Sequence, residues 1–204
     1  MSTLKVDNLS SVDGNSTVLT GGNYRPGEII EVISGTCDGR TVTGISGSYT
    51  LENVTAELNF STTPVDVTGG TIVYTPPTGT NTVIYNFQYT DTRDSDTYSL
   101  WHISMFMDSD GSGTGFTEVT ASRKSHYISY QAGHSTFQYV IQCNASTEDI
   151  SKGQLTSWTT ARTLKMQVRE YNDTVNSAMH TLEYWAGTNN FQISPPQLTI
   201  TAIA

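Results

Sequence analysis

Alternation of large apolar residues with small or polar ones constrains this chain of 204 residues more than any other feature. A period of two is the period of a β-strand, in which successive side chains point to opposite faces. Each alternating segment therefore predicts a strand with one row of side chains on a core and the other facing outward. The predicted core rows are Val83, Tyr85, Phe87 and Tyr89; Trp101, Ile103, Met105 and Met107; Phe137, Tyr139 and Ile141; and Leu164, Met166 and Val168, the last row alternating with outward Lys165, Gln167 and Arg169.

Turn residues separate the strand-like segments at intervals of about 8 to 12 residues, which is typical of an all-β sandwich or barrel. The first segments after Glu28 are EIIEVIS, RTVTGIS, SYTLENVT and TIVYT. Glycines between them can adopt positive φ at little steric cost. The final strand, LTITAIA, follows Pro195-Pro196, which interrupts pairing and sets its start.

Composition favours the same fold class. Ser and Thr occupy 55 of the 204 positions, and only 14% of residues are charged. Residues 147–158 alone have a weak helical pattern, which Gly153 interrupts, so a loop or a single helical turn is expected there. Connections too short for parallel crossovers predict an all-β, antiparallel two-sheet sandwich, with a jelly roll as the specific arrangement.

The first 27 residues differ from the rest of the chain. They contain short apolar pairs separated by Asp-Gly, Gly-Gly and Pro-Gly, and nothing large to bury. Such a segment does not fold alone. We therefore expect residues 1–27 to be an extended attachment or oligomerisation segment and residues 28–204 to be the sandwich domain.

Charge excludes some partners. The net charge is −9, and ten Lys and Arg are scattered thinly along the chain. A chain without a basic patch does not neutralise a phosphate backbone, so nucleic-acid binding is disfavoured. No window approaches the roughly 18 apolar residues of a membrane span, and the first residues have no apolar signal core. We expect no membrane insertion and folding in a cytoplasm, with Cys37 and Cys143 both reduced.

One loop has the start of a calcium-binding pattern. Residues 108–113 read DSDGSG, in which Asp108 and Asp110 could converge on a hard cation. Position twelve of the loop is Val119 instead of a bidentate Glu, which favours a solvated hairpin tip. If the loop binds calcium, it does so weakly, with Asp91, Asp94 or Asp96 lending carboxylates.

No catalytic motif is present in the sequence. The four histidines have no HxH, HxxxH or HExxH spacing, GxSxG is absent, and the two cysteines are far apart. A facing pair of carboxylates, as in glycosidases, stays possible among 19 Asp and Glu residues. We expect a protein that is not an enzyme and needs no cofactor.

Aromatic residues are the best candidates for binding. Tyr127, Tyr130 and Trp185 lie near predicted strand ends, where rings with a polar tip could stack on sugars or fill an interface. Residues 91–135 look rich in loops, and binding groups tend to lie on loops held by a rigid scaffold. We therefore expect any contact surface in that segment.

Several blocks of the sequence resemble small virion structural proteins of marine bacteriophages, described as tail-fibre or fibre-like proteins. The blocks are TLKVDNLSSVDGNSTVLT, GEIIEVISGTCDGRTVTGISGSYTLENVTAE, TGGTIVYTPPTGTNTVIYNFQY, SWTTARTLKMQVREYN, YWAGT and PPQLTITAIA. They span residues 3 to 90 and 157 to 204, whereas residues 91–156 have no counterpart. The resemblance implies a homotrimeric particle component, assembled in a bacterial cytoplasm and attached to other virion proteins by its N-terminus.

Three functions follow from these observations. The first is a fibre-like appendage that contacts a host surface glycan or protein. The second is a capsid decoration or cement protein. The third is a carbohydrate-binding module or a polysaccharide depolymerase, because jelly rolls host both and fold alone does not decide function.

Overall fold

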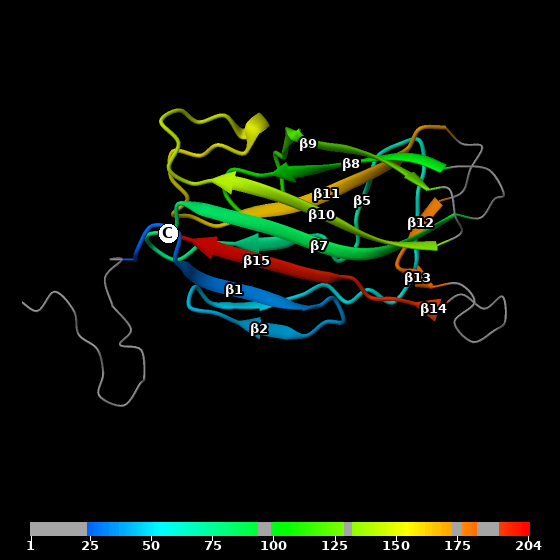
Figure 1. Cartoon of the computed structure of the whole chain (residues 1–204), viewed down its shortest axis with the longest axis horizontal. Helices are drawn as coiled ribbons and strands as arrows, with labels where there is room; N and C mark the ends of the chain where they lie inside the picture. Colours follow the sequence, from blue (N-terminus) through cyan, green and yellow to red (C-terminus); the bar gives the residue numbers. More distant parts are fainter. Residues whose placement is uncertain (1–23, 94–98, 129–131, 173–176, 183–191) are drawn as a thin grey trace, which may run out of the picture.

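Strands form the frame of the molecule, as the alternating pattern predicted (Figure 1). The computed structural model describes residues 24–93, 99–128, 132–172, 177–182 and 192–204. Within them the one helical element is a 3₁₀ turn, η1 (Ile150–Lys152), in the segment where a loop or single turn was predicted. No helix in these ranges is long and apolar enough to cross a membrane. The all-β prediction is confirmed.

The first sheet is organised around β7 (Thr82–Arg93). One edge of β7 pairs with β10 (Ala132–Gln142), and the other pairs with β15 (Gln197–Ile203) and then with β12 (Ser177–Met179). β15 pairs in turn with β1 (Ile29–Thr36), and β12 pairs with β4 (Leu58–Asn59). All of these pairings are antiparallel.

The second sheet is organised around β8 (Ser99–Met107), which pairs with β9 (Thr117–Ile128) and β11 (Arg162–Glu170). The far edge of β11 pairs with β6 (Ile72–Tyr74) and β5 (Val65–Asp66). Two smaller antiparallel pairs complete the described strands: β2 (Thr41–Thr43) with β3 (Ser48–Thr50), and β13 (Thr181–Leu182) with β14 (Gln192–Ile193).

Eight of these strands form a nested series of pairs. In chain order they are β1, β6, β7, β8, β9, β10, β11 and β15, and the first pairs with the last, the second with the seventh, the third with the sixth and the fourth with the fifth. The resulting sheet orders are β1-β15-β7-β10 and β6-β11-β8-β9. This nested order is that of a jelly roll, which confirms the predicted arrangement.

The core lies between the two sheets and contains the predicted inward rows. Tyr85 and Phe87 of β7 and Trp101 and Met105 of β8 have no exposed surface. Tyr89 of β7 meets Trp101 of β8 between the sheets, with ring centroids 6.1 Å apart. Burial of these large side chains is the main stabilising contribution, at about 2 kcal/mol for each fully buried residue.

Different parts of the chain lie at the two ends of the sandwich, which we call the base end and the distal end. At the base end, the Gly27 amide donates a hydrogen bond to the Ala204 carbonyl, so the described start of the chain lies beside its last residue. The distal end contains the strand termini at Arg93, Ser99, Ile128 and Ala132. A strand rises about 3.3 Å per residue, so the 12 residues of β7 separate the two ends by roughly 40 Å (Figure 1).

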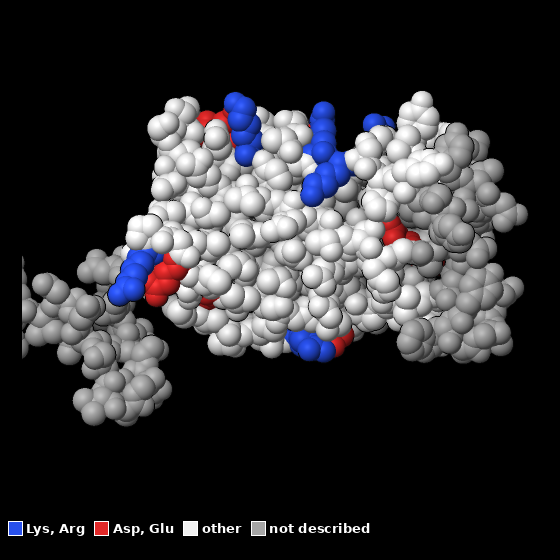
Figure 2. All heavy atoms as spheres, viewed as in Figure 1, with Lys and Arg blue, Asp and Glu red and all other residues white. Residues whose placement is uncertain are grey.

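Among the described side chains, the outer face of β1, β15, β7 and β10 carries no Asp, Glu, Lys or Arg. One row across it consists of Val32, Thr201, Ile84 and Val140, which are neighbours in the strand register. Val32 is 50% exposed and Val140 51% exposed. The outward residues on the same strands are mostly Ser, Thr, Asn and Gln. Figure 2 shows the centre of this face without charge, with Lys and Arg mainly toward its borders and a small acidic patch near the distal end.

Candidate functional site

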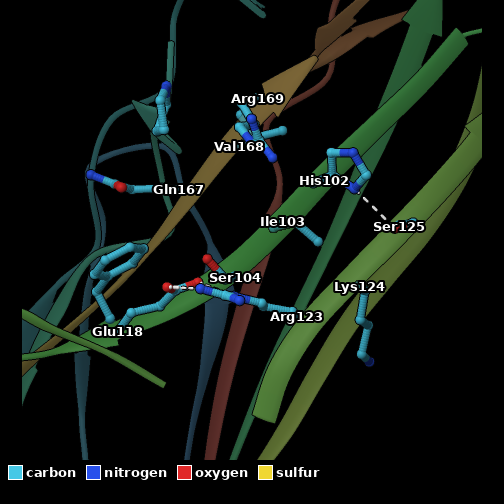
Figure 3. Close-up of a pocket in the computed structure, with 12 residues that line it drawn as sticks. His102, Ile103, Ser104, Glu118, Arg123, Lys124, Ser125, Gln167, Val168 and Arg169 are labelled. Carbon is cyan, nitrogen blue, oxygen red and sulfur yellow. Dashed lines mark hydrogen bonds and ion pairs between the residues drawn. The ribbon is translucent and has the colours of Figure 1, made fainter. Parts of the chain in front are cut away.

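A groove of about 420 Å³ lies on the outer face of β11, β8 and β9 (Figure 3). Its floor is a grid of outward side chains from three neighbouring strands. On β8, the strand register places His102 between Arg169 of β11 and Ser125 of β9, and Phe106 between Lys165 and Glu118. Gln167 of β11 lies beside Ser104. We call this surface the outer groove.

Period-two alternation explains why these side chains meet. On β8 the residues Trp101, Ile103 and Met105 point into the core, so His102 and Ser104 point outward. On β11 the same rule directs Gln167 and Arg169 outward, as the sequence predicted.

A bulge in β9 shapes one wall of the groove. Ile103 pairs with Lys124 and Met105 with Val119, so two steps along β8 correspond to five along β9, and three extra residues bulge from β9. The Ser122 hydroxyl occupies the interrupted position and accepts a hydrogen bond of 2.8 Å from the Met105 amide. Bulges of this kind redirect side chains, and here Arg123 extends over the groove.

Arg123 and Glu118 form a fork-shaped ion pair across the bulge. Nε and Nη2 of Arg123 donate to the two carboxylate oxygens at 2.8 and 2.6 Å. Hydrogen bonding to Arg123 lowers the pKa of Glu118, although partial burial opposes this effect. Glu118 is the only carboxylate among the residues that line the groove, and it is ionised and neutralised by Arg123.

His102 lies at the distal part of the groove. Its Nδ1 is 2.9 Å from the Ser125 hydroxyl, and its ring meets the Tyr171 ring edge-on at 6.4 Å. Partial burial, reinforced by the positive charge of Arg169, lowers the pKa of His102 below its usual value of 6.5. The imidazole is therefore neutral at pH 7.

Arg169 is the one exposed guanidinium in the groove that is not committed to an ion pair. Lys165 pairs with Asp66 and Arg123 with Glu118, whereas no ion pair within the described part of the chain includes Arg169. Lys124 points away from the groove in Figure 3, and its ammonium group donates to the Gln138 carbonyl at 3.0 Å. Lys124 also lies outside every ion pair of the described residues, so Arg169 is the unpaired cation that the described lining directs into the groove.

The candidate calcium loop lies at the base end, between β8 and β9. The Asp108 carboxylate is buried and accepts hydrogen bonds from the backbone amides of Gly111, Gly113 and Thr163, at 3.0, 2.8 and 2.6 Å. Burial opposes but does not outweigh these bonds, which lower the pKa of Asp108. Asp110 accepts from the Ser112 amide at 3.0 Å. Among the described residues no group of three or more His, Cys, Asp or Glu could hold a metal, and calcium binding by this loop stays a prediction.

The suggestion that Asp91 could assist that loop is wrong. Asp91 lies near the distal end, where its Oδ2 is 3.0 Å from Nε2 of His126 and accepts a hydrogen bond of 3.1 Å from Ser135. β8 runs from that end to Asp108, roughly 25 Å away. Asp94 and Asp96 lie outside the described residues.

The group of Asp91, His126 and Ser135 differs from a nucleophilic triad. In a triad the carboxylate and the hydroxyl contact different ring nitrogens. Here both approach the same Nε2, with Ser135 Oγ at 3.4 Å. Instead, His126 and Ser135 are the partners of the buried Asp91 carboxylate.

The predicted aromatic binding residues are only partly described. Tyr127 is 59% exposed on β9 at the distal end, whereas Tyr130 and Trp185 lie outside the described residues. The segment 91–135 was expected to be rich in loops, and this is wrong, because β8, β9 and the ends of β7 and β10 fill most of it. The outer groove was not predicted as a site, since its members come from three distant stretches of sequence.

Comparison with known proteins leaves the family open. No protein-family model matches the chain, and no curated protein is significantly similar in sequence. Among solved structures, a chain of infectious bursal disease virus strain Gx aligns with 93% of this chain, at 10% sequence identity and a TM-score of 0.30. A chain of strain Gt aligns with 92% of this chain, at 9% sequence identity and a TM-score of 0.26. This chain covers 58% of the length of each. A chain of the empty cowpea mosaic virus particle aligns with 82% of this chain, over 81% of its own length, at 7% identity and a TM-score of 0.22. Similarities of this size assign neither family nor function.

Proposed function

We propose that this protein is a virion structural protein, a fibre-like appendage whose base end faces the particle and whose distal end faces outward. In this proposal residues 1–27 connect the chain to other virion proteins. The jelly roll then holds the distal end away from the particle surface, where it can meet a host cell.

The observation that carries the proposal is the placement of the two ends. The described N-terminal residues, from Arg25 to Glu28, lie at the base end beside Ala204. The strand termini at Ser99 and Ile128 lie roughly 40 Å away, at the opposite end. A chain attached through its first residues would therefore present these termini to the outside.

Two further observations support the proposal. The jelly roll is a fold of viral capsid and lectin domains, although fold alone does not decide function. The sequence blocks that resemble fibre-like phage proteins include β1, β6, β11, β15 and most of β7, five strands of the nested series.

The uncharged face of β1, β15, β7 and β10 supports self-association, and we propose the homotrimer that the resemblance implies. Each copy has a net charge of −9, so copies repel least where charges are absent. The centres of protein interfaces are depleted in charged residues. Replacing Val32 or Val140 with Lys should convert trimers into monomers in light scattering, whereas a wild-type protein that is monomeric at micromolar concentration would contradict this part of the proposal.

The same face also favours the second candidate, a capsid decoration protein. A broad uncharged sheet face could pack on shell subunits instead of on other copies. The number of copies per particle separates the two functions, because a few trimers on the tail indicate a fibre and tens to hundreds on the shell indicate decoration.

Deletion of residues 1–23 tests the attachment. This cut retains the hydrogen bonds of Arg25, Gly27 and Glu28 at the base end, so the jelly roll should keep its thermal unfolding temperature. The proposal predicts that the truncated protein folds but is absent from particles. A control with Tyr127 replaced by Ala should be incorporated normally, and normal incorporation of the truncated protein would contradict the proposal.

A further inference from the structure

Among the described side chains, the outer groove directs one unpaired positive charge toward a ligand, that of Arg169, because the unpaired Lys124 points away from the groove (Figure 3). Arg169 is exposed and lies outside every ion pair of the described residues, whereas Arg123 is occupied by Glu118. The neighbouring His102 is neutral at pH 7, and its Nδ1 lies 2.9 Å from the Ser125 hydroxyl. In a protein with a net charge of −9, an uncompensated guanidinium within a groove favours a ligand with an isolated negative charge.

An exposed aromatic ring lies next to this charge. Tyr171 is 66% exposed and directly follows β11, two residues after Arg169 and therefore on the same outward face. Arg169 and Tyr171 both adjoin His102, the first as its partner in the strand register and the second through the edge-on ring contact. Tyr171 is not itself a lining residue, but its ring contacts the lining residue His102 and provides an apolar face with a polar tip beside the groove.

The remaining lining is suited to hydroxyl groups. Ser104, Ser125 and Gln167 line the groove. The Gln167 amide donates to Asp66 Oδ1 at 2.8 Å and the Ser125 hydroxyl contacts His102 Nδ1, so both residues keep oxygen acceptors for sugar hydroxyls. An open groove of about 420 Å³ is within the usual range for small-ligand sites. The lining also includes Pro64, Ile103, Phe106 and Val168, so it combines polar and apolar groups. This mixture matches a saccharide, which has hydroxyl groups at its edge and C–H groups on its ring faces.

Two other ligand classes fit poorly. A peptide strand cannot add to β8, because both edges of β8 are already paired, with β9 and β11. A nucleic acid presents many phosphates, and one uncompensated Arg neutralises only one of them. A saccharide with one carboxylate per sugar matches the single charge, the ring and the hydroxyl partners together.

We propose that the outer groove binds an acidic saccharide whose carboxylate pairs with Arg169 and whose sugar ring stacks on Tyr171. Gln167, Ser104 and Ser125 bond the sugar hydroxyls, and the pair of Arg123 with Glu118 forms the wall of the groove. This site is independent of the virion role, because binding to the isolated protein requires no particle.

Calorimetric titration of the full chain with short acidic oligosaccharides tests the site. The probes are oligomers of galacturonate, mannuronate and guluronate and a sialylated oligosaccharide, each at up to millimolar concentration. At least one probe should bind, and its methyl ester, which has the same shape without the charge, should bind about tenfold more weakly. Absence of binding to every probe, or equal binding of acid and ester, would overturn the proposal.

Variants locate the interaction. Arg169→Gln should weaken binding of the acid about tenfold and leave binding of the ester unchanged, because the substitution removes only the ionic contact. Tyr171→Ala should weaken acid and ester alike. The matched control is Arg40→Gln, since Arg40 is also an exposed Arg but is paired with Asp38 away from the groove. An Arg169→Gln variant that binds the acid like the control would overturn the proposal.

Discussion

Arg123 and Glu118 meet across the bulge in β9, where two hydrogen bonds of 2.8 and 2.6 Å join the guanidinium to the carboxylate. The three extra residues of β9 make this contact possible, since Arg123 would otherwise follow the regular register of the strand. The pair removes the negative charge of Glu118 from a groove that would otherwise repel an acidic ligand. The bulge therefore determines the charge of the groove wall, because it places Arg123 where it can neutralise Glu118.

The first prediction concerns this pair. Arg123→Gln leaves the Glu118 carboxylate ionised and unpaired at the groove wall, so affinity for an acidic oligosaccharide should fall several-fold. The double variant Arg123→Gln with Glu118→Gln should recover most of the loss, because no unpaired carboxylate remains at the groove wall. Calorimetric titration measures both, and equal losses in the single and double variants would show that the charge of Glu118 is irrelevant.

Binding should also depend on pH through His102. Its pKa is below 6.5, lowered by burial and by Arg169, so the imidazole gains a proton only in mildly acidic solution. A bound carboxylate favours the protonated form, and affinity for an acidic saccharide should therefore rise as the pH falls below 6.5. His102→Gln should remove the rise, and a wild-type affinity that stays constant down to pH 5 would contradict the role given to His102.

Stability should fall in acid because of His180. This residue has no exposed surface, and neither ring nitrogen has a partner with hydrogen-bond geometry among the described residues. Burial lowers its pKa to about 4, which a weak interaction with the Thr68 backbone opposes only partly. The unfolded chain binds a proton below pH 6.5 and the folded chain does not, so stability is lost between pH 6.5 and about 4, by at most about 3 kcal/mol.

Denaturant titrations of the wild type and His180→Asn at several pH values measure this loss. Asn tolerates the positive φ of 72° at this position and carries no titrating group. The variant should lose less stability between pH 6.5 and 4 than the wild type. Parallel losses in the two proteins would assign the acid sensitivity to other groups.

The buried carboxylate of Asp91 should make Gly133 irreplaceable. Gly133 lies opposite Asp91 in the strand register, and a Cβ there would be 2.8 Å from Asp91 Oδ1. Gly133→Ala should destabilise the fold by about 1 to 3 kcal/mol in urea denaturation. In an Asp91→Ala background the same substitution should cost less, and an equal cost in both backgrounds would show that the carboxylate is not the obstacle.

Both cysteines should be inert in the folded protein. Cys37 and Cys143 are free and buried, and burial is the main cause that raises the pKa of each thiol to about 12. The thiolate is the reactive form, so iodoacetamide at pH 8 should label neither cysteine until denaturant is added. Rapid labelling of the native protein would contradict the packing around them.

Local sequence pattern was enough to predict the strands and their inward rows. Tyr85 and Phe87 alternate with polar residues and are fully buried, and β15 begins directly after Pro195-Pro196. The outward row of Lys165, Gln167 and Arg169 was also predicted, although it was not recognised as part of a site. These features follow from the period-two alternation of side chains, which can be recognised within a short window of the sequence.

The groove and the distal carboxylate could not be predicted, because both depend on pairing between distant residues. The neighbours Arg169 and His102 are far apart in sequence, and no local pattern encodes the bulge that moves Arg123. Asp91 occupies an inward position of β7, where the pattern calls for an apolar side chain. It is accommodated there because His126 and Ser135 supply partners and Gly133 leaves space.

Cryo-electron microscopy of purified virions can show directly how the chain is oriented on the particle. We expect density for a jelly roll whose base end, with Arg25 and Ala204, faces the particle and whose distal end, with Ser99 and Ile128, faces outward. Density with the distal end against the particle, or virions that lack the chain altogether, would contradict this orientation.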